Sequence, residues 1–327
     1  MDFKHLVVLI FLVVLIPACL ADPMDICPPK DLTTPCVCRN HFDDGRAIVT
    51  CEKITGKDVI LDVLNKTSDY GYGYFMIDLS SLTYIPAAAF EIKKLVRLII
   101  MDTTMVSLFD KPPNAKDLLG LTAYGLKLSR AIQWDLFTEI PNLKNLTIQN
   151  SPLRNIDDKF VQYAPKSLER ITISNCSISK VHEEAFASMN SLIDIVMDEG
   201  KIKTLARSMF PTPAEIRKFS FKNQRIESLP ENLFSDMPHL QHLWLTGNLI
   251  SQISENTFKA PFKILMSCLL DKNPIKCNCS IRWIALIKDR EGVFWRNLLG
   301  RCEEPKNLHG VELTALTPNH FQHCEGF

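Results

Sequence analysis

Apolar residues recur along the chain in one fixed spacing. In LQHLWLTGNLISQI, which begins at Leu240, they fall at offsets 0, 3, 5, 10 and 13, and Asn248 stands at offset 8. Copies of this template start at Tyr72, Leu95, Leu118, Leu143, Leu168, Leu192, Ile216 and Leu240, with a truncated copy at Leu265. Successive starts are 23 to 25 residues apart. A period this regular indicates a repeat architecture rather than two separate globular domains.

Each copy predicts one β-strand of a stacked array. Side chains at offsets 3 and 5 point to one face of the strand, and those at offsets 2, 4 and 6 point to the other. A single copy buries about six apolar side chains at about 2 kcal/mol each, whereas ordering about 24 residues costs about 1.5 kcal/mol apiece. Because one copy cannot fold alone, the copies must stack into a parallel sheet whose two ends need covers.

Two other positions of the template bear on packing. A phenylalanine stands at offset 18, or close to it, in seven copies, as Phe90, Phe137, Phe160, Phe186, Phe210, Phe234 and Phe258. Offset 8, in contrast, is asparagine only at Asn248 and Asn273. We therefore expect an incomplete side-chain ladder at this turn, and we expect the copy from Leu118 to be the most irregular.

The N-terminal residues have the pattern of a secretory signal peptide. MDFKHLVVLIFLVVLIPACLAD contains a lysine, an apolar run too short to cross a membrane, and small residues before a cleavage position after Ala21. The C-terminal tail lacks the hydrophobic stretch of a glycolipid anchor. With Lys+Arg 37 and Asp+Glu 37, the chain has no net charge to attract nucleic acid or an anionic membrane. We expect a secreted, extracellular protein without a membrane anchor.

Ten cysteines remain after the signal peptide, and eight of them lie near the two ends of the chain. These eight are Cys27, Cys36, Cys38, Cys51, Cys277, Cys279, Cys302 and Cys324. In an oxidising compartment such clusters more often form disulfides than metal sites, although spacing alone leaves three pairings at each end. The alternative is a zinc site built from Cys277, Cys279, His320 and His323, whose cysteines are closer together than zinc ligands usually are.

The residue order at the two ends carries a family resemblance. CPPKDLTTPCVCRN with IVTC, and NPIKCNCSIRW with RCEEPKNLHGVEL, resemble the caps of extracellular leucine-rich-repeat proteins, the class that includes Slit modules, Toll ectodomains and the Nogo receptor. The resemblance implies an α/β fold, a leucine-rich-repeat solenoid with a concave parallel β-sheet and disulfide-capped ends. It also implies recognition without catalysis and without a cofactor, and the pairs Cys27–Cys38, Cys36–Cys51, Cys277–Cys302 and Cys279–Cys324.

The chain divides accordingly into four parts. We expect a signal peptide at 1–21, an N-terminal cysteine-rich cap with a first irregular repeat at 22–71, repeats at 72–275, and a C-terminal cysteine-rich cap at 276–327. Trp283 lies in a helical apolar pattern after Cys279 and is expected to pack over the last repeat. Cys176 and Cys268 fall four strands apart, roughly 19 Å at about 4.8 Å per strand, which is beyond disulfide reach. Both should be buried and unpaired.

Signatures of catalysis do not occur in the sequence. It contains no G-x-S-x-G, H-E-x-x-H, Walker loop or Rossmann fingerprint. His239 and His242 lie three residues apart, but a solvated surface explains them better than a catalytic or metal role. We therefore do not expect an enzyme.

The concave face is the expected binding surface of a solenoid. Apolar or aromatic residues stand at its outward offsets as Tyr74, Met76, Ile99, Met101 and Tyr124 in the early copies, and His242 and Trp244 follow in a late copy. Exposed apolar area concentrated in this way often marks a partner site, although a cap or loop folded over the early set would explain it equally well. We expect a protein or glycan partner and no nucleic acid.

Glycosylation signals limit where such a partner could lie. N-x-S/T occurs at Asn65, Asn145 and Asn175, and also at Asn278, which we expect to be poorly modified because it lies between two bonded cysteines. Sugars on Asn145 and Asn175 would stand on or beside the central concave sheet. Binding would then divide between the two ends of the solenoid.

A narrower resemblance offers a second function. The cap phrases CPPKDLTTPCVC and NPIKCNCSIRWI look most like secreted arthropod proteins related to the non-catalytic subunit of Oplophorus luciferase. This implies an accessory subunit whose partner is a secreted oxygenase subunit. A secreted recognition or adhesion protein is our first expectation, and the accessory subunit is the alternative.

Overall fold

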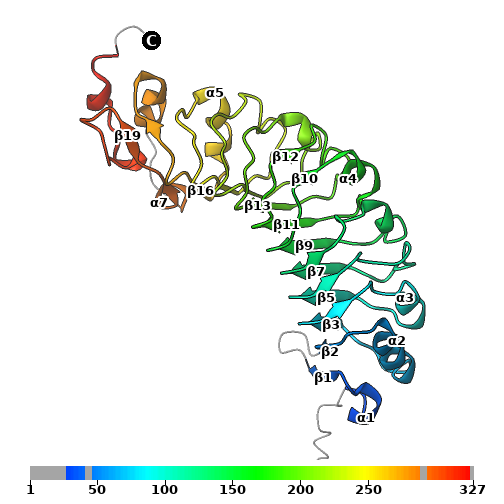
Figure 1. Ribbon diagram of the computed structural model, residues 1–327. Helices are drawn as coiled ribbons and strands as arrows, with labels where there is room; N and C mark the ends of the chain where they lie inside the picture. Colours follow the sequence, from blue (N-terminus) through cyan, green and yellow to red (C-terminus); the bar gives the residue numbers. More distant parts are fainter. Residues whose placement is uncertain (1–26, 41–45, 288–292, 325–327) are drawn as a thin grey trace, which may run out of the picture.

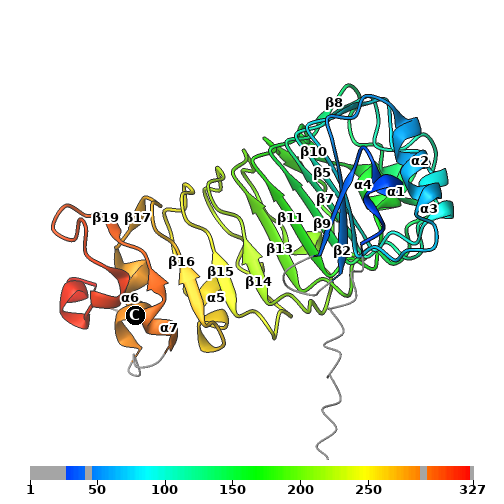
Figure 2. The same cartoon turned by 90° about the horizontal axis from the view of Figure 1, so that it is seen from below.

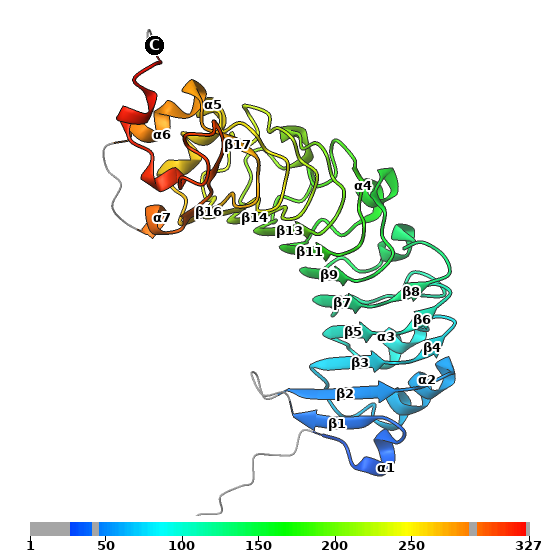
Figure 3. The ribbon, with the colours of Figure 1, turned by 60° about the vertical axis from the view of Figure 1, so that its left-hand side comes forward.

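The computed structural model describes residues 27–40, 46–287 and 293–324, so the expected signal peptide lies outside the described residues. The described residues form one curved solenoid. Its main sheet lies along the inner side of the curve, and the helices of the repeats lie along the outer side (Figures 1 and 3). The N-terminal and C-terminal caps lie at opposite ends of the arc.

One sheet of 12 strands runs through the described part of the chain, and its strands follow one another in chain order (Figure 2). They are β1 (Val37–Asn40), β2 (Ala47–Glu52), β3 (Tyr74–Asp78), β5 (Arg97–Met101), β7 (Gly120–Tyr124), β9 (Asn145–Gln149), β11 (Arg170–Ser174), β13 (Asp194–Asp198), β14 (Lys218–Ser220), β15 (His242–Trp244), β16 (Ser267–Leu269) and β18 (Leu298–Leu299). Strand β1 pairs antiparallel with β2, and the later pairings of this sheet are parallel. The predicted α/β fold with a concave parallel sheet is confirmed.

The strands lie where the apolar spacing places them. Each repeat strand begins two residues after the start of its copy, from Tyr74 in β3 to Ser267 in β16. Offsets 3 and 5 point into the core, as the fully buried Leu243 and Leu245 illustrate. The copy from Leu118 forms the five-residue strand β7, paired on both sides, so the expectation that this copy is the most irregular is wrong for its strand.

Short helices and small sheets complete the repeats behind the main sheet and form the caps. The α-helices are α1 (Lys30–Thr33), α2 (Lys57–Lys66), α3 (Ala88–Ile92), α4 (Asp158–Tyr163), α5 (Glu255–Phe258), α6 (Arg282–Leu286) and α7 (Val293–Arg296). The 3-10 helices are η1 (Trp134–Phe137), η2 (Arg207–Met209), η3 (Pro261–Lys263), η4 (Cys279–Ile281), η5 (Leu313–Ala315) and η6 (Pro318–Phe321). The short strands are β4 (Ser81–Leu82), β6 (Thr104–Met105), β8 (Lys127–Leu128), β10 (Asn155–Ile156), β12 (Lys180–Val181), β17 (Ile275–Lys276) and β19 (Cys302–Glu304). In the part of the chain that is described, no helix combines the length and apolar character needed to cross a membrane.

The phenylalanines near offset 18 form an aromatic row through the core. Neighbouring rings along it lie 5.7 Å apart from Phe90 to Phe109 and 5.9 Å apart from Phe186 to Phe210, measured between ring centroids. The copy from Leu95 has Pro113 at offset 18, and Phe109 of the same copy takes the missing place in the row. The row therefore continues through a copy in which the spacing alone would break it.

The backbone takes a left-handed conformation at offset 7 of each copy. The residues with positive φ at this position are Leu79, Asp102, Gly125, Asn150, Asn175, Glu199, Asn223, Gly247 and Lys272. Glycine and asparagine adopt this conformation with the least strain. A Cβ atom at Gly247 would also lie 2.1 Å from the side-chain oxygen of Asn223 in the preceding copy. At Gly247, glycine therefore avoids both the strain of a φ of 73° and a close contact with the Asn223 side chain.

The asparagines at offset 8 are buried directly after this turn and satisfy backbone groups there. Asn248 Oδ1 accepts a hydrogen bond from Ile226 N at 3.1 Å. Its Nδ2 donates to Phe221 O at 2.7 Å and to Leu245 O at 2.9 Å. Asn273 repeats the arrangement one copy later. One side chain therefore ties three backbone segments together.

Other residue types continue this ladder where asparagine is missing. The hydroxyls of Ser80, Thr103 and Ser151 each donate to a backbone carbonyl two residues earlier and accept from a backbone N–H of the preceding copy. The longer Gln224 accepts from Ile202 N at 2.9 Å. It occupies space beside Gly200, where a Cβ atom would lie 2.6 Å from Gln224 Oε1. The ladder is more complete than we expected, and the buried Leu126 and the side-chain-free Gly200 are its exceptions at offset 8.

Four disulfides close the two caps. The Cα atoms lie 5.6 Å apart in Cys27–Cys38, 4.3 Å in Cys36–Cys51, 5.5 Å in Cys277–Cys302 and 5.6 Å in Cys279–Cys324. This is the pairing that the family resemblance implies. Trp283 of α6 is buried against the last repeat, where its Nε1 donates to Ile253 O at 3.0 Å. The C-terminal cap thus covers the apolar end of the solenoid.

The two internal cysteines are unpaired and buried, as their positions in the repeat predict. Cys176 Sγ donates to the backbone carbonyl of Ser174 at 3.2 Å. Burial raises the pKa of both thiols, most strongly that of Cys268. Both residues are structural members of the core.

Candidate functional site

Outward side chains form three rows along the concave sheet, because strand residues in register stand side by side. The first row comprises Tyr74, Arg97, Gly120, Asn145, Arg170, Asp194, Lys218, His242 and Ser267. The middle row comprises Met76, Ile99, Thr122, Thr147, Thr172, Val196, Ser220, Trp244, Leu269 and Leu299. The third row comprises Asp78, Met101, Tyr124, Gln149, Ser174 and Asp198. The chemistry of these rows changes from one end of the sheet to the other.

The N-terminal end of the concave face is less accessible than the sequence suggests. Tyr74 is buried, with 7% of its surface exposed, so the expectation that its ring faces solvent is wrong. Arg97 on the next strand covers part of this ring: its guanidinium lies 5.2 Å from the ring centre and donates from Nη1 to the Tyr74 hydroxyl at 2.8 Å. Met76, Ile99 and Met101 are half-buried, and Tyr124 is exposed.

The centre of the sheet is polar. Three threonines, Thr122, Thr147 and Thr172, are adjacent in the middle row. Beside them, Arg170 Nε donates to Asp194 Oδ2 at 3.1 Å in the first row. This part of the sheet offers hydrogen-bonding groups and paired charges, and little apolar surface.

The expected glycosylation sites lie at different depths. Asn145 is half-buried in the first row of β9, whereas Asn175 is exposed at the left-handed turn after β11. Asn175 Nδ2 donates to Asn150 Oδ1 at 2.8 Å. Asn65 is exposed near the end of α2, away from the concave face. Whether any of the three carries sugar stays a prediction.

The C-terminal end of the concave face is built around Trp244. Lys218 Nζ lies 4.2 Å and Lys222 Nζ 5.4 Å from the centre of the Trp244 ring, which places two ammonium groups against one indole. Trp244 Nε1 donates to Ser267 Oγ at 3.1 Å, and His242 Nδ1 lies 2.9 Å from the same oxygen. These contacts fix the orientation of the half-buried indole. We name Lys218, Lys222, His242, Trp244 and Ser267 the tryptophan cluster.

Apolar side chains extend the tryptophan cluster toward the C-terminal cap. Leu269 is half-buried beside Trp244 in the middle row, and Leu299 of β18 follows with 45% of its surface exposed. Met266, also 45% exposed, directly precedes β16. Sequence analysis missed Leu299, because its strand lies in the cap beyond the last copy of the template. No signal in the spacing of the repeats marks this strand.

The charges around Trp244 are only partly neutralised. Lys222 Nζ lies 3.2 Å from Asp198 Oδ2, and Asp198 Oδ1 also accepts from Ser220 Oγ at 2.7 Å and from the Lys222 backbone N–H at 2.9 Å. Within the described residues, Lys218 forms no ion pair with a carboxylate. The tryptophan cluster therefore presents an aromatic ring beside one unneutralised cation.

Metal-ligand chemistry at the C-terminal end is blocked by the disulfides. Among the described residues, one group of potential ligands lies close enough to hold an ion, and it consists of Cys279, His323 and Cys324. Cys279 and Cys324 are bonded to each other, as Cys277 is to Cys302, so these sulfurs are not thiolates. The alternative zinc site with Cys277 and Cys279 therefore lacks its thiolate ligands.

A family model agrees with this geometry. The BspA type leucine-rich repeat region matches six copies, over residues 127–240 and 159–266. The chain has the leucine-rich-repeat fold, closed at each end by a disulfide-bonded cap.

Solved structures agree on this leucine-rich-repeat fold. The chain superposes with a TM-score of 0.62 and 14% identity on a chain of the octameric complex of Latrophilin 3, Unc5D and FLRT2 (LRR), over 90% of this chain and 98% of that chain. The mouse RP105/MD-1 complex gives a TM-score of 0.52 and 19% identity over 78% of this chain and 39% of that chain.

Sequence relatives match parts of the chain. Osteomodulin of Bos taurus is 30% identical over 153 residues, which are 40% of this chain and 35% of the relative. Epiphycan of Gallus gallus is 27% identical over 89 residues, which are 27% of each protein. The NT-3 growth factor receptor of Gallus gallus is 28% identical over 75 residues, 23% of this chain and 9% of the relative. The chain thus spans about a third or less of the length of these relatives.

Proposed function

We propose that this leucine-rich-repeat protein is secreted, has no enzymatic activity and recognises a protein partner through the C-terminal half of its concave sheet. The tryptophan cluster is the observation that carries the proposal. Trp is over-represented among the residues that dominate binding energy at protein interfaces. Here an indole whose orientation is fixed by a hydrogen bond lies beside Lys218, and Leu269 and then the exposed Leu299 follow it in the same row.

A fixed orientation favours binding, because a side chain that is already ordered loses less conformational entropy when a partner packs against it. Trp244 is held by Ser267 and by the ammonium groups of Lys218 and Lys222 before any partner arrives. The polar centre of the sheet, with the glycosylation signal at Asn145, provides less apolar surface. This distribution supports binding at an end of the concave face rather than across its middle.

The comparisons support the kind of partner. The two superposable structures are complexes of proteins, and a growth factor receptor is among the relatives. The protein carries four disulfides, which fits an oxidising compartment and therefore secretion. We propose a protein rather than a glycan because the apolar surface at Leu269, Leu299 and Met266 suits protein side chains.

Affinity capture from the native secretion tests the proposal. The mature protein and its Trp244→Ala variant serve as bait, and captured proteins are quantified by mass spectrometry. We expect Trp244→Ala to reduce capture of the partner at least about tenfold, as loss of a hot-spot residue costs about 2 kcal/mol or more. Tyr163→Ala is the matched control, since Tyr163 is a half-buried aromatic residue of α4 behind the sheet.

The result that refutes the proposal is equal capture by wild type and Trp244→Ala, with both proteins folded by circular dichroism. If Tyr163→Ala reduces capture of the partner as much as Trp244→Ala does, the binding surface includes the outer side of the solenoid instead. Met101→Ala reports separately on the N-terminal end of the concave face. A loss confined to that variant would move the site to the early repeats.

The alternative function is an accessory subunit of a secreted luciferase-like monooxygenase complex. It is supported by the short sequence motifs around Cys36 and Cys279 in the two caps, which resemble those of such subunits. The same capture experiment separates the two functions, because an accessory subunit should retain a stoichiometric catalytic partner of one kind. Oxygenase activity in the eluate would favour this alternative.

A further inference from the structure

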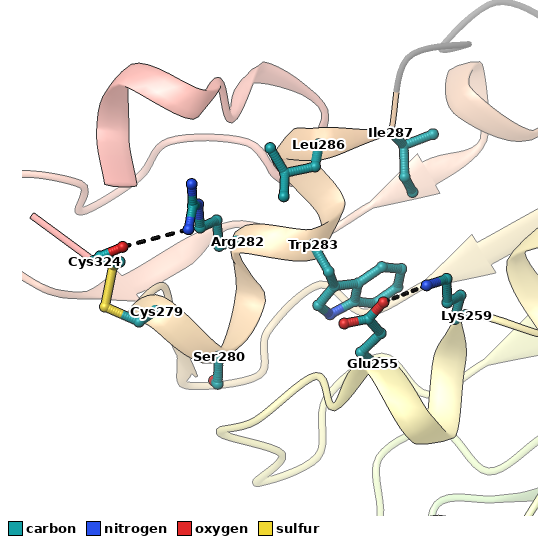
Figure 4. Close-up of a pocket in the computed structure, with 9 residues that line it drawn as sticks. All are labelled: Glu255, Lys259, Cys279, Ser280, Arg282, Trp283, Leu286, Ile287 and Cys324. Carbon is teal, nitrogen blue, oxygen red and sulfur yellow. Dashed lines mark hydrogen bonds and ion pairs between the residues drawn. A yellow bond between two sulfur atoms is a disulfide. The ribbon is translucent and has the colours of Figure 1, made fainter. Parts of the chain in front are cut away.

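A cleft of about 740 Å³ lies between the last repeat and the C-terminal cap, away from the concave sheet (Figure 4). Helix α5 of the last repeat forms one wall. Helix α6 of the cap and the Cys279–Cys324 disulfide form the other. Its volume is in the range typical of small-molecule sites, about 300–1,000 Å³.

The cleft has an apolar part made by α6 and the residue after it. Trp283, Leu286 and Ile287 line this part, and Leu286 has 50% of its surface exposed. The only polar atom of the Trp283 side chain, Nε1, is already bonded to Ile253 O. The nearly buried indole therefore presents only carbon atoms to the cleft, and an apolar ligand covering the exposed Leu286 would remove that surface from water.

Arg282 supplies an unsatisfied cation in the same cleft. Its Nη1 donates to the Cys324 carbonyl at a long 3.3 Å, and its Nε is buried without any acceptor among the described residues. No carboxylate of the described residues forms an ion pair with Arg282. A guanidinium has five N–H donors, and leaving a buried donor without a partner is unfavourable.

The other charged groups of the cleft neutralise each other. Lys259 Nζ lies 2.5 Å from Glu255 Oε1 within α5. Ser280, which also lines the cleft, donates its hydroxyl to Asn278 Oδ1 at 2.6 Å. Arg282 is thus the charge in the cleft whose electrostatic partner is missing.

We infer that the cleft binds a small amphipathic carboxylate, of the chemical class of a medium-chain fatty acid. The carboxylate accepts hydrogen bonds from the Arg282 guanidinium, whose fork geometry matches two carboxylate oxygens. The aliphatic chain lies over Trp283 and Leu286. A purely apolar ligand would leave Arg282 unpaired, and a small anion such as acetate would leave Leu286 uncovered. The carboxylate and the chain are therefore both needed.

Calorimetric titration of the intact protein with octanoate, octanamide and acetate tests this site. Octanamide has the same chain without the charge, and acetate has the charge without the chain. We expect octanoate to bind at least about tenfold more tightly than octanamide, because hydrogen bonds to charged groups are the stronger ones. Acetate should show no binding at the same concentrations.

Variants assign the effect to the named residues. Arg282→Met should weaken octanoate binding at least about tenfold and leave octanamide binding unchanged, so that the preference for the charged ligand disappears. Leu286→Ser should weaken both eight-carbon ligands, and because Leu286 is half exposed this change leaves the fold intact. The matched control is Lys306→Met, which removes an exposed cation of the cap outside the cleft.

Three results would overturn the inference. They are the absence of octanoate binding, equal affinities for octanoate and octanamide, and an unchanged octanoate affinity in Arg282→Met. If Arg282→Met does not fold, the inference is tested by the octanoate affinity of Leu286→Ser and by the relative affinities of wild type for octanoate, octanamide and acetate. Trp244→Ala leaves the cleft untouched, so failure of this inference and failure of the proposed partner recognition can be distinguished.

Discussion

Replacing Asn248 with alanine should cost more stability than almost any other change of one polar side chain in this protein. The residue is buried with 3% of its surface exposed, and it is hydrogen-bonded to three backbone groups. Alanine leaves the N–H of Ile226 and the carbonyl of Phe221 without these partners, whereas the carbonyl of Leu245 keeps its hydrogen bond from Asn273 Nδ2. Each unsatisfied buried group costs about 1–3 kcal/mol, so two such groups give a loss of at least about 2 kcal/mol.

Urea unfolding followed by circular dichroism measures this loss. The matched control is Asn142→Ala, because Asn142 is an exposed asparagine with a single hydrogen bond, from Nδ2 to Lys116 O at 2.8 Å. We expect the control to cost less than about 0.5 kcal/mol, as surface substitutions usually do. If Asn248→Ala and Asn142→Ala destabilise the protein equally, the reasoning about the ladder is wrong.

Three other predictions concern the backbone, a buried amine and a buried thiol. Gly247→Ala should lower the unfolding free energy by about 1–3 kcal/mol, since φ is 73° and Asn223 Oδ1 occupies the Cβ position; thermal unfolding of this variant beside wild type measures it. Lys93→Met should speed hydrogen exchange in the last turn of α2, because the buried Lys93 ammonium donates to three backbone carbonyls at residues 67, 68 and 70. Burial raises the pKa of Cys268 above its ordinary value of 9.0. The folded state then holds this proton longer than the unfolded state, so stability should fall as pH rises above about 9, and Cys268→Ala should reduce that fall in urea titrations at pH 8 and pH 10.

The fold follows from the sequence because the template fixes both the period and the face of each strand. The strand from Tyr74 to Asp78 and eight later ones begin at the predicted offset. The burial of Cys268 follows from the same alternation, whereas that of Cys176 follows from its place at offset 8, the buried turn position. Periodicity succeeds here because a one-residue slip would turn every core side chain of a strand to solvent.

Details that depend on contacts between copies could not be read from the spacing. The contact of Arg97 with the Tyr74 ring is one example: the Arg97 side chain also lies over Gly120 on the next strand, where a Cβ atom would lie 3.2 Å from Arg97 Cγ. Gln224 replaces asparagine in the ladder because Gly200, one copy earlier, leaves it room. The two residues of such a pair are distant in sequence, and neither residue type by itself indicates the contact.

The concave candidate site could be predicted only in part. Offset rules place Trp244 and His242 on the concave face, and the structure brings them together with Lys218 and Ser267. The repeat offsets do not predict the position of Leu299, because this residue belongs to the cap and joins the sheet through β18. Cap residues follow no repeat, so their place beside the last strand depends on tertiary packing.

Footprinting of the captured complex tests the central claim most directly. Hydroxyl radicals oxidise accessible side chains, and mass spectrometry compares each residue in the free protein and in the protein bound to its partner. We predict strong protection of Trp244 and Met266 in the complex and unchanged oxidation of Tyr163 on α4. Equal oxidation of Trp244 in the free and bound protein would contradict recognition through the concave sheet.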